Sequence, residues 1–230
     1  MGVVARPLRW KNKSDGRSMR KSKINLSEAQ LFLSEQDRGL KRVISSVGDC
    51  MLSGRGSGTV FEYLARSIVY QQLSGKAAGT IHGRMLNLFE HNKPTSTALS
   101  ALPISVLRSA GLSHSKCLAL YDLAAWDQGG KLPGRKALNN MSDEEVVQTL
   151  IGIRGIGEWT AQMLLIFDLE RSDVLPVRDL GVLKGYQKMR GFKELPDPAK
   201  LGRAGLRWRP YRSVATWYLW RCLEVPLKAN

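Results

Sequence analysis

The segment of residues 150–181 constrains the fold of this 230-residue chain more than any other part of the sequence. It reads as a helix, a tight turn around Ile156, a second helix, and a loop that leads to Asp179. Two glycines flank Ile156, and glycine takes positive φ without steric cost, so the chain can reverse there while Ile156 packs between the helices. The segment therefore predicts a helical hairpin, which we place over residues 142–170.

The second helix of this hairpin would begin with backbone N–H groups that have no partner inside the helix. Such amides, together with the positive end of the helix dipole, bind phosphate well. Asp179 follows a loop that contains Pro176 and would place one carboxylate beside this phosphate clamp. Each feature also has a simpler interpretation, since Gly-x-Gly commonly connects helices and an aspartate that opens a helix is most often an N-cap.

The positive charge of the chain is concentrated at its two ends. The net charge is +15, with eight basic residues and one acidic residue in 1–23, and eleven basic and three acidic residues in 184–230. The segment between them is therefore neutral overall. Charge segregated in this way favours a polyanionic partner, most simply nucleic acid. Residues 1–23 are polar and lack periodicity, so we expect a disordered tail that adds non-specific DNA affinity or serves as a weak nuclear-targeting signal.

Several classes of protein are disfavoured by composition. No run of eighteen apolar residues is present, so no membrane span is expected, and the first residues lack the apolar core of a secretory signal. The three cysteines lie far apart without a Cys-x-x-Cys motif. This spacing argues against a zinc site, an iron–sulfur cluster or a disulfide framework, and it suits a reducing compartment. We expect no metal site built from side chains.

The rest of the chain predicts an all-α fold of nine to eleven helices, because no segment shows sustained alternation of apolar and polar residues. Thr59 and Ser142 each begin a capping box, and residues 53–58 read as a loop. Pro210 is predicted at the first position of the final helix. The glutamines at 71–72 end an apolar helix, either as a solvated helix end or as a polar protrusion that probes a ligand.

Four motifs, taken in order, resemble those of the helix-hairpin-helix DNA glycosylases, and specifically the 3-methyladenine DNA glycosylase II (alkylbase) branch. They are ARSIVYQQLSGKAA, LIGIRGIGEWTAQMLL, DVLPVRDLGV and RPYRSVATWYLWR. The resemblance implies that residues 24–230 form a glycosylase domain with two helical subdomains flanking a cleft. That cleft would receive a base flipped out of duplex DNA, because chemistry on a base requires its extrusion from the stack.

The resemblance also implies roles for residues of the reaction site. Asp179 matches the essential aspartate of the family. Trp159 stands where bifunctional relatives carry a lysine that forms a Schiff base, so attack on the sugar by an amine is not available and the chain should be monofunctional. Trp159, Met163 and Trp220 are expected to line the base pocket. Of Trp217 and Trp220, three positions apart on the final helix, we expect one in the core and one at the cleft.

A second group of residues is expected to contact DNA. Gln72 matches the position that fills the gap left by the flipped base. Gly155, Gly157 and Thr160 match the hairpin that grips phosphate, and Lys116 is added as a further DNA-binding residue. The resemblance allows a monovalent cation on backbone carbonyls of the hairpin and implies no other cofactor.

These features predict a monofunctional glycosylase that hydrolytically excises alkylated bases, of the 3-methyladenine and 7-methylguanine type, from double-stranded DNA. A carboxylate in a site poor in water stabilises the positive charge that builds on the sugar, and aromatic faces attract a cationic base. Two alternatives stay open: a glycosylase-like protein that binds damaged DNA with little or no excision, and an unrelated helical DNA-binding protein. We expect a monomer that acts inside the cell, in a nucleus or in the bacterial cytoplasm and nucleoid.

Overall fold

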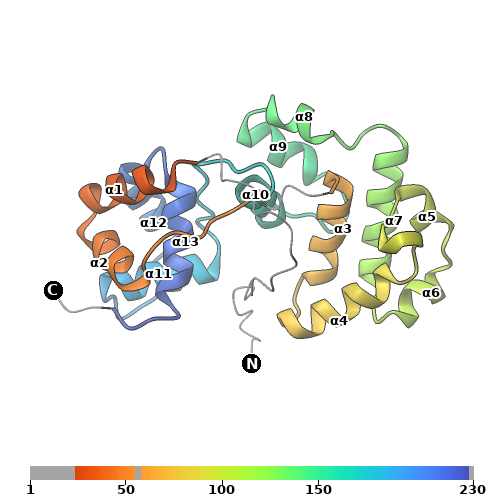
Figure 1. Cartoon of the computed structure of the whole chain (residues 1–230), viewed down its shortest axis with the longest axis horizontal. Coiled ribbons are helices and arrows are strands. Elements are labelled where there is room, and N and C mark those ends of the chain that lie inside the picture. Colours follow the sequence, from red (N-terminus) through yellow and green to blue (C-terminus); the bar gives the residue numbers. More distant parts are fainter. Residues whose placement is uncertain (1–23, 55–57, 228–230) are drawn as a thin grey trace. The chain divides into compact units, whose positions relative to one another are not determined.

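The computed structural model describes residues 24–54 and 58–227, so the predicted tail at 1–23 and residues 55–57 of the predicted loop lie outside the described residues. All regular structure within the described ranges is helical (Figure 1), which confirms the all-α prediction. These ranges hold thirteen α-helices and two 3-10 turns rather than nine to eleven helices. Part of the excess comes from helices of five or six residues, which are too short to leave a periodic pattern in the sequence.

The described chain divides into two compact units, each of which is described by itself. We call described residues 58–164 the hairpin unit, and described residues 24–54 together with 165–227 the carboxylate unit. The hairpin unit contains α3 (Val60–Tyr70), α4 (Gly75–Leu86), η1 (Glu90–Asn92), α5 (Ser96–Ala101), α6 (Ile104–Ser109), α7 (His114–Gln128), α8 (Arg135–Asn139), α9 (Asp143–Leu150) and most of α10 (Glu158–Phe167). The carboxylate unit contains α1 (Leu26–Gln36), α2 (Arg38–Val47), the end of α10, α11 (Leu180–Arg190), α12 (Pro198–Gly205), η2 (Leu206–Trp208) and α13 (Arg212–Cys222).

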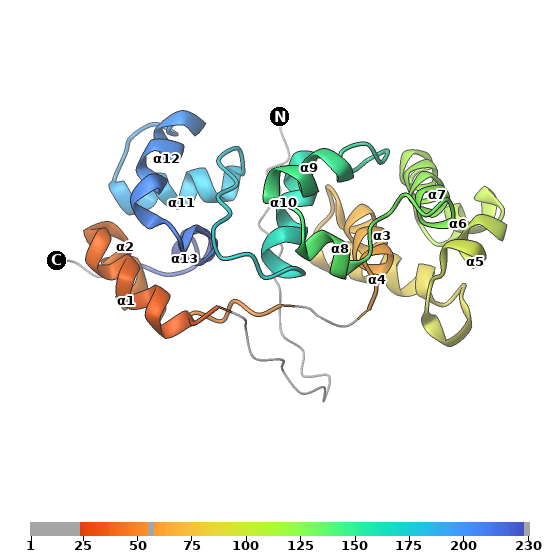
Figure 2. The same cartoon turned by 90° about the horizontal axis from the view of Figure 1, so that it is seen from above.

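Helix α7 packs against α3, α5 and α6 within the hairpin unit, and Figure 2 shows it beside α5 and α6. Helix α3 also packs against α4. Both predicted capping boxes are present, at Thr59 before α3 and at Ser142 before α9. The apolar helix that precedes the paired glutamines is α3, and its large aliphatic and phenyl side chains are buried; they are Val60, Phe61, Leu64, Ile68 and Val69.

Helix α13 forms the core of the carboxylate unit and is buried along residues 213–220, packed against α11, α2 and α1. Gly185 allows the close approach of α11, because a Cβ there would lie 2.0 Å from the carbonyl oxygen of Leu219. The prediction for Pro210 is wrong, since α13 begins at Arg212 and the cis Arg209–Pro210 peptide belongs to the preceding turn. Hydrogen bonds between Ser213 and the loop at 171–174 fix the start of the helix instead: Ser213 donates to the carbonyls of Arg171 and Ser172 and accepts from the Val174 N–H.

A buried aspartate divides the N-terminal helical segment in two. Asp37 ends α1 and caps α2, where its Oδ1 accepts from the backbone N–H of Gly39 at 2.8 Å. Its Oδ2 accepts from Trp208 Nε1 at 2.9 Å and pairs with the guanidinium of Arg190. Because Arg190 is the last residue of α11, this ion pair anchors the C-terminal end of the helix that Asp179 begins.

No helix among the described residues combines the length and the apolarity that crossing a bilayer requires.

Candidate functional site

The predicted hairpin is formed by α9 and α10, which are joined by residues 151–157. Gly155 has a φ of 78°, and a Cβ there would lie 2.9 Å from Ala119 Cβ, so both backbone and packing require glycine. Gly157 differs: its φ is not positive and an added Cβ would meet no atom within 4 Å. Of the two glycines that are free to take positive φ, only Gly155 does so. Ile156 is buried, as predicted.

The turn presents the start of α10 to the outside of the hairpin unit. Gly157, Glu158 and Trp159 are exposed, with 39% of Trp159 accessible. Thr160 is only 3% accessible, and its hydroxyl is hydrogen-bonded to Gln71. A phosphate contact at Thr160 would therefore involve its backbone N–H, which belongs to the first helical turn and has no acceptor inside the helix. The open space around Gly157 suits close approach of a ligand to the backbone.

The turn between α3 and α4 holds the predicted gap-filling residue. Gln72 is exposed and has a φ of 56°, in the left-handed region that residues other than glycine seldom adopt. Lys116, at the start of α7, lies close to this turn, and its ammonium donates to the carbonyl oxygens of Val69 and Gln71, each at 2.8 Å. Burial lowers the pKa of Lys116. The ammonium of Lys116 is thus hydrogen-bonded within the protein, and its contact with DNA stays a prediction.

Asp179 occupies the N-cap of α11, so its interpretation as a helix cap is confirmed. Its Oδ1 accepts from the backbone N–H of Val182 at 2.7 Å and from Trp220 Nε1 at 2.9 Å. Two donors on one oxygen fix the orientation of the carboxylate. Gly181 leaves room for this contact, since a Cβ there would lie 3.0 Å from Trp220 Cδ1. The catalytic role of Asp179 is a separate prediction that this geometry supports.

The indole of Trp220 stacks on Phe167, with ring centroids 5.8 Å apart and an interplanar angle of 17°. Trp217 and Trp220 are both buried within the carboxylate unit, with 7% and 9% accessible. Burial does not distinguish them, and the placement of one in the core and one at the cleft stays a prediction. Burial of Trp220 follows from its position between α11 and the end of α10. Met163 is also buried, in the hairpin unit, where its carbonyl accepts from the Tyr63 hydroxyl at 2.9 Å.

The predicted site residues thus fall into two sets. Asp179 and Trp220 meet within the carboxylate unit. The others belong to the hairpin unit, where the structure brings the turn after α3, the side chain of Lys116 and the hairpin together; these residues are Gln72, Lys116, Gly155, Gly157, Trp159, Thr160 and Met163.

Phe167 and Gly181 were not predicted from the sequence, and Gln71 was considered only as a solvated helix end or a protrusion toward a ligand, not as a contact of the hairpin. The paired glutamines at the end of an apolar helix were a usable signal for Gln71. Phe167 and Gly181 gave no local signal, because their importance depends on Trp220, which lies more than one helix away along the chain.

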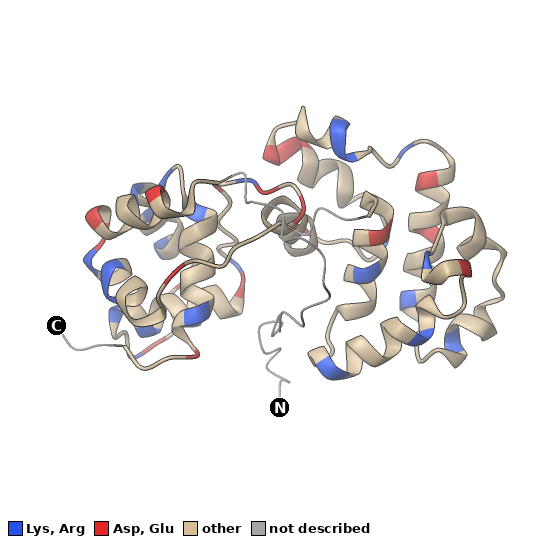
Figure 3. Cartoon of the chain, in the orientation of Figure 1, with Lys and Arg blue, Asp and Glu red and all other residues tan. Residues whose placement is uncertain are grey.

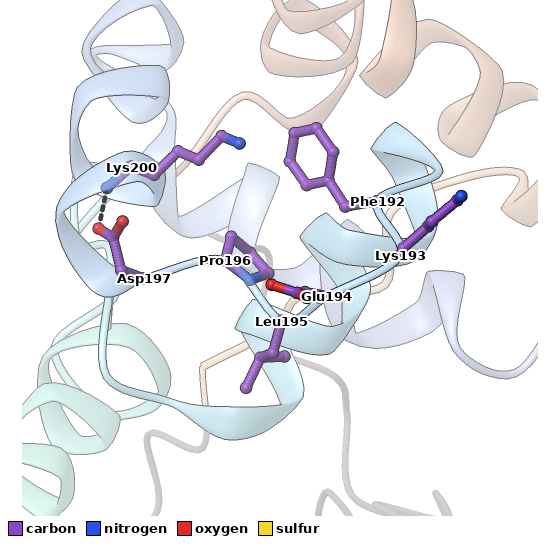
Figure 4. A pocket seen from close by; sticks show the side chains of 7 residues that line it. All are labelled: Phe192, Lys193, Glu194, Leu195, Pro196, Asp197 and Lys200. Atoms are coloured by element: carbon purple, nitrogen blue, oxygen red, sulfur yellow. Dashed lines mark hydrogen bonds between the residues drawn. The ribbon is translucent and has the colours of Figure 1, made fainter.

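Other features of the described residues lie outside these two sets of predicted site residues. No group of three or more His, Cys, Asp or Glu side chains in the described ranges could hold a metal ion. The three cysteines are free and buried, and burial raises the pKa of Cys50 to about 12. An open hollow of about 460 Å³ lies in the loop before α12 (Figure 4), where Lys200 Nζ is 3.9 Å from the ring centroid of Phe192. It contains neither Asp179 nor Trp220.

Lys and Arg residues occur on helices of both units (Figure 3). Helices α11 and α12 carry five basic residues and no acidic residue. Part of the C-terminal positive charge is neutralised within the carboxylate unit, so it is not all available to a polyanion. The ion pairs concerned are Arg190–Asp37, Arg209–Asp173, Arg212–Asp173 and Arg221–Glu224.

Comparison with known proteins gives consistent matches. A family model described as HhH-GPD superfamily base excision DNA repair protein matches residues 65–210. DNA-3-methyladenine glycosylase 1 of Schizosaccharomyces pombe is 31% identical over 203 residues, which cover 87% of this chain and 89% of that protein. The alkylbase DNA glycosidase-like protein mag2 of the same yeast is 27% identical over 88% of this chain and 96% of its own length.

Solved structures agree with these matches. The S. pombe 3-methyladenine DNA glycosylase in complex with abasic DNA has a TM-score of 0.80 and 30% identity, covering 88% of this chain and all of that one. A DNA-3-methyladenine glycosidase from Bacillus halodurans has a TM-score of 0.74 and 31% identity, covering 89% of this chain and 91% of that one.

Proposed function

Because the chain belongs to the HhH-GPD superfamily of base excision DNA repair proteins, we propose that it is a monofunctional DNA glycosylase. It hydrolytically excises alkylated bases, of the 3-methyladenine and 7-methylguanine type, from duplex DNA and leaves an abasic site. The observation that carries this proposal is the Asp179 carboxylate, oriented by two donors beside the stacked rings of Trp220 and Phe167.

The oriented carboxylate fits the charge that develops in this reaction. As the bond between C1′ of the sugar and the base nitrogen breaks, its electron pair leaves with the base and positive charge builds on the sugar. A fixed carboxylate stabilises that charge without reorganising. Water then forms the new bond to C1′, and Asp179 orients this water or accepts its proton. The hydrogen bonds from Val182 and Trp220 hold the carboxylate in place for this role.

The residue at position 159 determines whether the protein only hydrolyses the bond to the base or can also cleave the DNA strand. A Schiff base with the sugar requires an amine, and Trp159 offers only an indole. The abasic site would therefore be released uncut. Incubation of the wild-type protein with damaged duplex and borohydride should trap no covalent complex, and trapping would refute the monofunctional assignment.

The aromatic side chains favour alkylated bases as substrates. Methylation at a ring nitrogen can make a purine cationic, which improves it as a leaving group. A cation over an aromatic face gains about 0.5–2 kcal/mol, depending on how well it is desolvated. Trp220 and Phe167 offer such faces in the carboxylate unit, and Trp159 and Met163 are the proposed pocket residues of the hairpin unit.

The hairpin would supply binding that is independent of sequence. Exposed amides at the start of α10 and the open backbone of Gly157 suit a phosphate of the DNA backbone. Backbone carbonyls of the hairpin are the proposed place for a monovalent cation, and no other cofactor is proposed. The protein would act as a monomer where genomic DNA lies, inside the cell.

One observation favours a second candidate function. Asp179 caps α11, so the fold has a use for this residue even without catalysis. A protein that recognises damaged DNA and excises little or nothing would keep the same aspartate. The two candidates are separated by Asp179→Asn, because the amide oxygen of asparagine can still accept from Val182 and Trp220 while the negative charge is lost.

The test is release of methylated purines from duplex DNA, followed by heat or alkali to reveal abasic sites. We expect wild type to release base and Asp179→Asn to release at least about 100-fold less, as for loss of a preorganised electrostatic group. Equal release by both proteins would refute the catalytic role of Asp179. No release by either, with binding of both to damaged duplex, would establish the DNA-binding alternative.

A further inference from the structure

The turn at residues 71–74 is held from one side by Lys116. The last carbonyls of α3 have no partner inside the helix, and the ammonium of Lys116 donates to two of the carbonyls at this end, those of Val69 and Gln71. A cation at a helix C-terminus also interacts favourably with the helix dipole. Lys116 therefore fixes the direction in which the chain leaves α3.

The same turn is held from the other side by the Gln71 side chain. Its Nε2 donates to the carbonyl oxygen of Gly155 at 2.8 Å and lies 3.3 Å from Thr160 Oγ1. A carbonyl oxygen can only accept, so the amide nitrogen must face the hairpin. Gly155 lies in the hairpin turn and Thr160 in the first turn of α10, so one side chain contacts both parts of the hairpin.

Gln72 follows directly after these two anchors. Its backbone has positive φ and its side chain is exposed. Within the described part of the chain no hydrogen bond holds this side chain. Since left-handed backbone is unfavourable for a residue with a Cβ, contacts of the neighbouring residues must maintain it. Ser74 caps α4 on the far side of Gln72, and on the near side the side chains of Gln71 and Lys116 hold the turn.

We propose that Gln71 and Lys116 are positioning residues that join the Gln72 turn to the hairpin, so that the phosphate clamp and the gap-filling side chain act as one assembly. This inference rests on the proposed function, because it takes Gln72 as the side chain that enters the DNA. It assigns Lys116 to the carbonyl oxygens of Val69 and Gln71, and not to a phosphate of the DNA. It also makes Gln71, which the sequence left as a solvated helix end or a protrusion toward a ligand, the link between two DNA-contacting segments.

A merely structural role for the two residues would give a different result in a double-mutant cycle. If Gln71 acts through Gln72, its loss should matter only while Gln72 is present. If Gln71 simply stabilises the hairpin unit, its loss should weaken binding equally with either residue at position 72. Interaction between neighbouring substitutions is measured by the departure from additivity.

The probe is a duplex that contains a tetrahydrofuran abasic analogue with 2-aminopurine opposite it, whose fluorescence reports whether a side chain fills the gap. We expect Gln71→Leu to weaken binding to this duplex about fivefold in the wild-type background and less than about twofold in a Gln72→Ala background. The change in 2-aminopurine fluorescence on binding should be lost with Gln71→Leu and with Lys116→Met. Effects that multiply in the double variant would overturn the proposal.

Matched controls come from the same unit. Gln148 is an exposed glutamine of α9, and Lys136 an exposed lysine of α8. Gln148→Leu removes the same amide, and Lys136→Met removes the same charge. Both should leave the fluorescence change intact, and a loss equal to that of Lys116→Met would show that charge alone is responsible.

The probe separates this inference from the proposed function, because the analogue cannot be excised. Failure of wild type to release methylated purines would refute the function while the cycle could still be measured. Normal release combined with purely additive effects of Gln71 and Gln72 would refute the inference alone.

Discussion

The two units of this protein present their functional groups in opposite ways. In the hairpin unit the groups proposed to meet DNA are backbone amides and an exposed glutamine, and their positions depend on turns such as those at Gly155 and Gln72. In the carboxylate unit the central groups are side chains, Asp179 and Trp220, held by hydrogen bonds and packing. A phosphate grip needs accessible backbone, whereas charge stabilisation needs a carboxylate that does not move.

The largest expected effect concerns the carboxylate itself. Asp179→Ala should abolish base release to the same degree as Asp179→Asn, by at least about 100-fold in kcat. Only the alanine variant should also lose stability, by about 1 kcal/mol, because it removes the N-cap of α11. Single-turnover kinetics and thermal unfolding measure the two effects. Equal stability of the two variants would contradict the structural half of the assignment.

The next effect tests packing within the carboxylate unit. Gly185→Ala would place a Cβ 2.0 Å from the carbonyl oxygen of Leu219. The backbones of α11 and α13 must then separate, at a cost of about 1–3 kcal/mol or more in the free energy of unfolding. Denaturant titration measures this loss. Since Asp179 and Trp220 lie on the two displaced helices, base release should fall as well, and unchanged activity would argue against a rigid carboxylate.

A smaller effect isolates the hydrogen bond between Trp220 and Asp179. Trp220→Phe keeps an aromatic ring beside Phe167 but removes the N–H that donates to Oδ1 at 2.9 Å. A hydrogen bond to a charged group contributes about 1.5–3 kcal/mol, so kcat should fall roughly 10-fold or more. KM for methylated duplex should change little. A rise in KM with constant kcat would instead assign Trp220 to binding of the base alone.

The smallest effect is expected in the hairpin and provides the contrast with Gly185. In Gly157→Ala the added methyl group would have no atom within 4 Å, and the backbone at this position does not have positive φ. The free energy of unfolding should therefore fall by less than about 1 kcal/mol, which is the cost of placing alanine just before a helix. Affinity for undamaged duplex should nevertheless fall several-fold, because the methyl group keeps a phosphate away from the backbone. Fluorescence anisotropy at fixed salt concentration measures this change. Full affinity would exclude Gly157 from the phosphate contact.

Local features of the fold were predictable from the sequence, because their causes are local. The capping boxes at Thr59 and Ser142, the buried Ile156 and the Asp179 N-cap each depend on residues within one helical turn. The number of helices and the start of α13 were not predictable. Short helices leave no period, and the start of α13 is set by contacts of Ser213 with a loop some forty residues earlier.

The connections that organise the site could not be read from local patterns either. Trp220 and Asp179 are 41 residues apart, Gln71 and Gly155 are 84 apart, and Asp37 and Trp208 are 171 apart. Each pair is joined by a side-chain hydrogen bond that exists only when distant helices pack. The resemblance to a family identified Asp179 and Trp220 but left Gln71 without a role.

The order of segments along the chain has a consequence for biosynthesis. The hairpin unit is one uninterrupted stretch, whereas the carboxylate unit is assembled from residues on both sides of it. Domains emerge from the ribosome N-terminus first. Helices α1 and α2 are therefore synthesised early, but Asp37 can bind Arg190 and Trp208 only after α11 and η2 have been made. Packing of the unit is complete only once α13 follows. A nascent chain can complete its hairpin long before Trp220 has been made, so hydrolytic competence would arise only after α13 has been synthesised.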